Sequence, residues 1–256
     1  MAHVTLPELL FLIGVAFAAG TIDAIGGGGG LLTVPSLLAV GLPPHFALGT
    51  NKGQSVFGSF TAIFRYAHAG LIDRRAARIT APAGFLGSFA GAALVSFMRP
   101  DVLRPVVLVM LVVAAVVVAW IRPSPSVGWE AFKRHAVPAA AAAALLIGCY
   151  DGFFGPGTGT FLIAAWVGLL GVSFTRASAD AKVVNFASNL AAVVLFSQRG
   201  MIVWVIALPM AAAQVFGGFL GAHIAVRRGD RLVRGVVLVI VFALLVKVAR
   251  DFYFGR

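Results

Sequence analysis

Charged residues are scarce in this chain. They make up 11% of its 256 residues, whereas hydrophobic residues make up 60%. A water-soluble domain carries roughly 25% charge, so this sequence lacks the polar residues that would cover a soluble globule. Its apolar runs have the length of bilayer spans, each of about 20 residues, and they lack the polar–apolar alternation of barrel strands. The sequence therefore predicts an all-α polytopic membrane protein, with apolar runs at 6–19, 102–120, 137–147, 201–221 and 236–248.

Other absences exclude further classes of protein. Cys149 is the one cysteine, so no intrachain disulfide can form. Residues 1–10 contain no Lys or Arg, so the basic region of a signal peptide is missing, and we expect the first apolar run to be a retained helix. The histidines His45, His68 and His223 lack metal-ligand spacing, and we predict neither a metal nor a cofactor.

Catalytic and nucleotide motifs are also missing. The sequence offers no cluster of acid, base and nucleophile, so we predict that the protein is not an enzyme. Neither glycine run fits between the strand and helix of a βαβ unit, and no GxxxxGK[ST] occurs. The net charge of +11 has two readings: basic loops that fix orientation and contact anionic lipids, or a field that concentrates an anionic substrate. With no soluble domain, we expect no nucleic-acid partner.

What the chain does have is an internal repeat. TIDAIGGGGGLL at 21–32 and LGTNKGQSVFGSF at 48–60 resemble CYDGFFGPGTGTFL at 149–162 and SADAKVVNFASNL at 178–190. Asp23 corresponds to Asp151 and Lys52 to Lys182. Interrupted apolar segments at matching positions of two halves indicate a transport site.

The repeat divides the chain into a first transmembrane repeat at 1–121, a cytoplasmic linker at 122–135 and a second transmembrane repeat at 136–256. We predict five helical segments in each. The second of each set is too short to cross about 30 Å of hydrocarbon, so the total is about 8–10 transmembrane segments including two short broken or re-entrant helices. The predicted segments are 5–24, 31–41, 45–66, 76–98 and 102–121, then 136–152, 159–171, 174–197, 201–226 and 232–252.

Basic residues suggest the orientation of the two halves. Cytoplasmic loops carry the Lys/Arg excess. If both basic clusters are cytoplasmic, the halves are inverted, the linker lies inside and both ends of the chain lie outside. A re-entrant segment that does not cross would instead give eight spans and parallel repeats. The clusters are Arg65, Arg74, Arg75 and Arg78 in the first half, and Arg227, Arg228, Arg231 and Arg234 in the second.

The glycine runs at 26–30 and 155–159 break their helices. Unpaired backbone inside a membrane survives only within protein or beside a water-filled cavity, and amides at the start of the following helix attract anions. We expect those amides, near Gly30 and Gly159, to face a cavity. The alternative is that glycine merely lets helices pack closely. The candidate binding residues here are Gly28, Gly29, Gly30, Gly157, Thr158 and Gly159.

Lys52 and Lys182 begin the third segment of each half. A lysine within a membrane is costly and is a functional candidate unless it extends to the headgroups. Polar residues at i, i+4 spacing beside each lysine form a stripe on one helix face. This stripe predicts a substrate path lined with hydrogen-bond donors, and Gln214 is a further candidate for the cavity. The candidates on the stripe are Asn51, Gln54, Ser55, Asn185 and Asn189.

Asp23 and Asp151 end the first segment of each half, just before the glycine breaks. One interpretation is structural, in which they cap the short helices or form ion pairs with the lysines. The other is proton coupling, because carboxylates within membranes are typical proton carriers.

These motifs resemble a known family. AGTIDAIGGGGGLLTVPSLLAVGLPPHFALGTNK at 19–52, with YDGFFGPGTGTFL and AKVVNFASN within 150–189, is similar to the TauE/SafE, or TSUP, family of bacterial permeases, in particular its uncharacterised inner-membrane branch. The resemblance implies a multi-pass inner-membrane secondary transporter of sulfite or an organosulfonate that is driven by the proton gradient. Alternating access would come from rocking one repeat against the other. The glycine blocks and the lysine segments would form its pathway. An anion channel and a non-transporting membrane scaffold are the alternatives, and a homodimer is left open.

Overall fold

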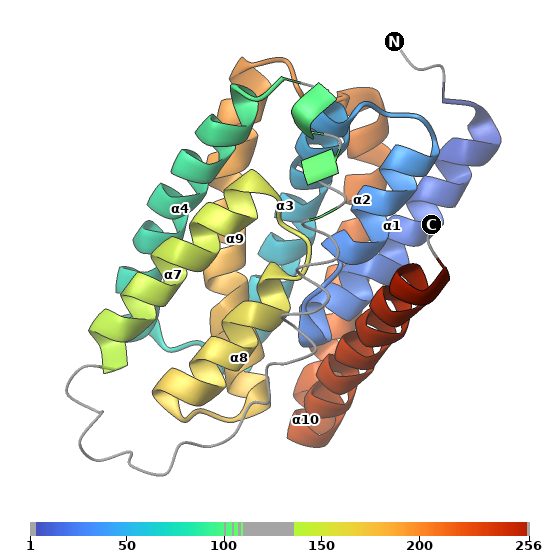
Figure 1. Ribbon diagram of the computed structural model, residues 1–256. Helices are drawn as coiled ribbons and strands as arrows, with labels where there is room; N and C mark the ends of the chain where they lie inside the picture. The colour runs from blue at the N-terminus through green and yellow to red at the C-terminus, as the bar shows by residue number, and fades with distance from the viewer. Residues whose placement is uncertain (1–3, 100, 104, 107–108, 110–135, 255–256) are drawn as a thin grey trace.

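The computed structural model describes residues 4–99, 101–103, 105–106, 109 and 136–254, and all regular secondary structure in these ranges is helical (Figure 1). The all-α prediction is therefore confirmed. The predicted linker at 122–135 and most of the segment at 102–121 lie outside the described residues. The helices are α1 (Leu6–Gly26), α2 (Gly30–Ala39), α3 (Pro44–His68), α4 (Arg74–Ser96), α7 (Ala136–Phe153), α8 (Thr158–Leu170), α9 (Phe174–Gln198) and α10 (Trp204–Phe254).

Four of the described helical stretches are long and apolar enough to cross a membrane: Leu6–Gly26, Arg74–Ser96, Phe174–Gln198 and Trp204–Val239. The last contains a break, because Gly229 has a φ of 66° that is not helical. This break separates the two segments predicted at 201–226 and 232–252. The protein is thus a multi-pass membrane protein.

The short helices turn back along the helices that precede them. α2 has 10 residues and α8 has 13, which give about 15 and 20 Å at 1.5 Å per residue. Leu37 of α2 shares a buried cluster with Leu12 of α1, and Trp166 of α8 shares one with Ala144 of α7. Two helical hairpins, α1–α2 and α7–α8, result.

Each hairpin is held by a helix from the other half of the chain. α1 packs along α10 and α4 packs along α7, while α3 and α9 pack together between these pairs (Figure 1). Paired glycines allow this close approach. A Cβ added at Gly87 or Gly91 of α4 would lie 2.0 or 1.9 Å from a carbonyl oxygen of α7, and one at Gly217 or Gly221 of α10 would lie 2.3 or 2.2 Å from a carbonyl oxygen of α1.

Hydrogen bonds fix the relative direction of α3 and α9. Near the start of α3, the Thr50 hydroxyl accepts from the Val203 amide, which follows the end of α9, at 3.1 Å. The Asp73 amide, which follows the end of α3, donates to Asp180 near the start of α9 at 2.7 Å. The two corresponding helices therefore run antiparallel.

Further hydrogen bonds place the two basic clusters together. Arg65 at the end of α3 donates to His223 of α10 at 3.3 Å. Asp230, beside the α10 break, accepts hydrogen bonds at the start of α9. The parts of α3, α4 and α10 that carry the predicted arginine clusters thus lie at one end of the bundle, with the start of α9.

Candidate functional site

The two glycine breaks contact each other in the middle of the bundle. Gly27 has a φ of 78°, and a Cβ added to it would lie 2.3 Å from the Thr160 amide nitrogen. The Thr160 hydroxyl donates to the Gly26 carbonyl at 3.0 Å. Only glycine allows two backbones to meet so closely at this positive φ. The tips of the α1–α2 and α7–α8 hairpins are therefore in direct backbone contact.

Both lysines are buried beside these tips, and each pairs with an aspartate of the other half. The Lys52 amine lies 2.6 Å from the Asp151 carboxylate, with 2% of each side chain exposed. The Lys182 amine lies 2.6 Å from the Asp23 carboxylate, and the lysine side chain is fully buried. Both amines are thus buried and paired inside the protein, rather than extended toward lipid at its surface.

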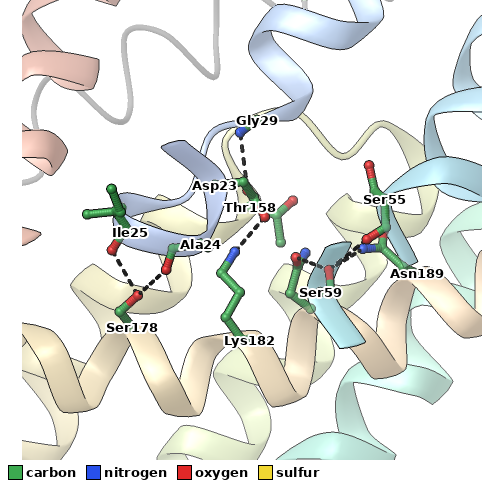
Figure 2. A network of polar contacts seen from close by, with 12 residues as sticks. Asp23, Ala24, Ile25, Gly29, Ser55, Ser59, Thr158, Ser178, Lys182 and Asn189 are labelled. Atoms are coloured by element: carbon green, nitrogen blue, oxygen red, sulfur yellow. Dashed lines mark hydrogen bonds and ion pairs between the residues drawn. The ribbon is translucent and has the colours of Figure 1, made fainter. Parts of the chain in front are cut away.

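Asp23 combines both structural roles that the sequence suggested, whereas Asp151 shows the ion pair. Asp23 accepts a hydrogen bond from the Gly29 amide at 3.1 Å while it pairs with Lys182 (Figure 2). Asp151 accepts from the Ser188 hydroxyl as well as from Lys52. The Asp23 side chain is 21% exposed, against 2% for Asp151. Asp23 is thus the carboxylate with access to solvent.

Amide and hydroxyl side chains connect the two lysine helices. The Lys52 amine donates to Asn189 at 3.0 Å, and Asn189 donates to Ser59 at 3.3 Å (Figure 2). Ser59 also donates to Asn185 at 3.1 Å. The polar stripes predicted on α3 and α9 therefore face each other and form one buried network.

A small cavity lies between these groups, and most of the predicted site residues line it. Its volume is ≈ 20 Å³, which is room for about one water molecule. Lys182 and Gln54 do not line this cavity; the Lys182 amine contacts Asp23, and the Gln54 side chain donates to Asn51. The lining residues are Asp23, Gly28, Gly29, Gly30, Asn51, Lys52, Ser55, Asp151, Gly155, Gly157, Thr158, Gly159, Asn185, Asn189 and Gln214.

The backbone amides at the breaks differ from the sequence-based expectation. The Leu31 amide donates to the Gly28 carbonyl at 2.9 Å, and the Thr158 amide donates to the Gly155 carbonyl at 3.1 Å. The Gly29 amide is bound by Asp23. Tight turns in the breaks therefore satisfy part of the amide set, and Gly30 and Gly159 line the cavity.

Sequence reasoning missed Thr33. Its hydroxyl, buried in the first turn of α2, donates to Asn51 of α3. The signal was present, because Thr33 stands three residues after Gly30, on the same side of a helix. Thr33 orients the Asn51 amide that lines the cavity.

Comparisons with known proteins agree with this architecture. The family model "Sulfite exporter TauE/SafE" matches residues 12–248. The chain is 34% identical over 239 residues to the probable membrane transporter protein YfcA of Escherichia coli K12, which covers 93% of this chain and 88% of that protein. It is 35% identical over 250 residues to a probable membrane transporter protein of Haemophilus influenzae. This alignment covers 97% of this chain and 96% of that protein. No solved structure gives a significant match.

Proposed function

Because this chain belongs to the sulfite exporter TauE/SafE family of membrane transporters, we propose that it is a secondary transporter of a small anionic sulfur compound, such as sulfite or an organosulfonate, in the bacterial inner membrane. The observation that carries this proposal is the pair of buried amines beside one polar cavity. A buried cation within a membrane protein marks a substrate or ion pathway. Amide and hydroxyl donors around it suit the oxygens of a sulfite or sulfonate group.

Charge balance supports proton coupling. With both aspartates ionised, Lys52, Lys182, Asp23 and Asp151 have no net charge, so the closed site offers little attraction for an anion. When an aspartate takes up a proton, its lysine loses its counter-ion and becomes able to pair with the substrate. Anion binding and proton uptake then favour each other, since linkage between two sites is reciprocal.

The arrangement of the two halves supports alternating access. Corresponding helices α3 and α9 run antiparallel, which is the relation expected of inverted repeats. The cavity has room for about one water, so substrate entry requires the hairpin tips to separate. We propose that rocking of one half against the other opens the site to each side in turn.

We expect proteoliposomes that contain the protein to show saturable counterflow of a sulfonate. Lys182→Met should reduce this counterflow at least about tenfold, because a charge-assisted interaction with the substrate is lost. Arg75→Met, which removes one positive charge from an exposed position at the start of α4, is the matched control and should transport normally. Unsaturable ohmic conductance would indicate a channel instead. Normal transport by correctly folded Lys182→Met protein would contradict the assignment of the buried amines to substrate binding.

Asp23→Asn should flatten the pH dependence of substrate binding. In the wild type we expect affinity for a sulfonate to rise on proton uptake, because anion binding and proton uptake favour each other. A sulfonate remains a monoanion over this range, so the dependence belongs to the protein. Isothermal titration of purified protein across pH 5–8 measures it. Asp101→Asn, in an exposed pair with Arg99, is the control. If Asp23→Asn keeps the wild-type pH dependence of binding, proton uptake at Asp23 is contradicted.

A further inference from the structure

A second concavity lies outside the transport site, on the flank of the bundle. It is a groove of ≈ 740 Å³ between Ile22 of α1 and the part of α10 that follows the break at Gly229. That part of α10 lies along the outside of the bundle (Figure 1). The groove is lined by Ile22, Arg228, Arg231, Leu232, Gly235, Val236 and Val239.

Two arginines stand at one end of this groove, on either side of the break. Asp230 between them accepts from the amides of Phe174 and Thr175 at 3.1 and 3.0 Å and from the Thr175 hydroxyl at 2.6 Å. These bonds anchor the break to the start of α9. Within the described part of the chain, neither Arg228 nor Arg231 has a carboxylate partner. Two exposed arginines without a carboxylate partner among the described residues thus stand at this end of the groove.

The rest of the groove is apolar. Leu232, Val236 and Val239 recur at helical spacing and form one face about 10 Å long at 1.5 Å per residue. A Cβ added at Gly235 meets no atom within 4 Å, so the groove has open space along this face. Val239 is 67% exposed, which leaves the far end open to the surrounding hydrocarbon.

We propose that this groove binds an anionic phospholipid, with its phosphate between Arg228 and Arg231 and an acyl chain along Leu232–Val239. A basic pocket beside a membrane helix with apolar walls matches the charge and the shape of such a lipid. Both arginines belong to a basic cluster, and Lys/Arg-rich ends of membrane helices favour the cytoplasmic side, so we assign the lipid to the inner leaflet. A second copy of this chain would bring no complementary charge through the same surface.

The lipid would brace the transport site. Val236 packs against Gly26, where an added Cβ would lie 3.0 Å from the valine Cγ1. Gly26 accepts the hydrogen bond from Thr160 that joins the two hairpin tips. Ile22, on the groove wall, immediately precedes Asp23. An occupied groove would therefore hold the second part of α10 against the glycine break.

Native mass spectrometry of the full-length protein in detergent tests the proposal. Titration with phosphatidylglycerol should give a discrete bound lipid at concentrations where phosphatidylcholine of the same acyl chains does not bind. Arg228→Gln with Arg231→Gln should weaken this binding at least about tenfold. Arg74→Gln with Arg75→Gln, which removes equal charge at the same end but on α4, should leave it unchanged. Equal binding by the two double variants would overturn the proposal.

A variant that keeps the charge covers the case in which the arginine variant fails to fold. Gly235→Leu fills the open groove and should displace phosphatidylglycerol while both arginines remain. Competition with inorganic phosphate is the last experiment. Competition by millimolar phosphate would show that only a headgroup site exists and would overturn the acyl-chain assignment, whereas no competition supports it. Each outcome is independent of whether the protein moves a sulfur anion.

Discussion

Asp151→Ala is expected to lower the free energy of unfolding by about 3–5 kcal/mol, because it leaves a buried ammonium without its counter-ion. Both partners of the Lys52–Asp151 pair are 2% exposed, so water cannot replace the lost carboxylate. We expect a marked drop in the thermal midpoint of the detergent-purified protein, and poor recovery from membranes. Fluorescence-detected unfolding together with size-exclusion chromatography measures both.

The double variant Lys52→Met with Asp151→Ala separates two effects on stability: the loss of the ion pair and the burial of an unpaired charge. Replacing a buried ion pair by apolar groups is often neutral for stability, so the double variant should recover most of the lost thermal midpoint while it binds no substrate. Asp23→Ala should cost less than Asp151→Ala, since the Asp23 side chain is 21% exposed. A double variant as unstable as Asp151→Ala would show that this pair does not act through charge compensation.

Gly27→Ala is expected to prevent assembly of the two hairpins. Its φ of 78° is unfavourable for a residue with a side chain, and the added Cβ would lie 2.3 Å from the Thr160 nitrogen and 2.4 Å from the Gly159 carbonyl carbon. The positive φ alone costs about 1–2 kcal/mol. The backbone contact adds to this, since the opposing atoms cannot rotate away as a side chain can. We expect loss of the monodisperse peak in size-exclusion chromatography and loss of transport.

Gly14→Ala is the matched control for that change. Gly14 lies within α1, whose last residue immediately precedes Gly27, and a Cβ added at Gly14 meets no atom within 4 Å. Alanine is the better helix former by about 1 kcal/mol, so this variant should fold at least as well as the wild type. Normal folding and transport by Gly27→Ala would mean that the tips do not meet as the structure shows.

Several elements could be predicted from the sequence because their causes are local. Apolar length and glycine runs set the helices and their breaks, so the predicted second segments at 31–41 and 159–171 agree with α2 and α8. These features depend on helix propensity and side-chain size, which are set by residues close together in the sequence.

The candidate site was predictable as a set of residues but not as a set of contacts. The repeat identified Lys52, Lys182, Asp23 and Asp151, and the structure brings all four together. No local pattern states that each lysine pairs with the aspartate of the other half. The sequence also gave no sign that Asp180 would accept a hydrogen bond from the Asp73 amide, or that Asp230 would accept one at the start of α9. These contacts join residues far apart in the chain.

By itself the sequence determined that this is a helical membrane protein with two related halves, two interrupted segments and two costly intramembrane lysines. Tertiary structure alone decided that the lysines are neutralised across the halves, that the site is closed to about one water, and that Asp23 has more access to solvent than Asp151. The physical reason is that hydrophobicity and backbone propensity act along the chain. The charge and size of a site depend instead on which distant side chains packing brings within a few ångströms.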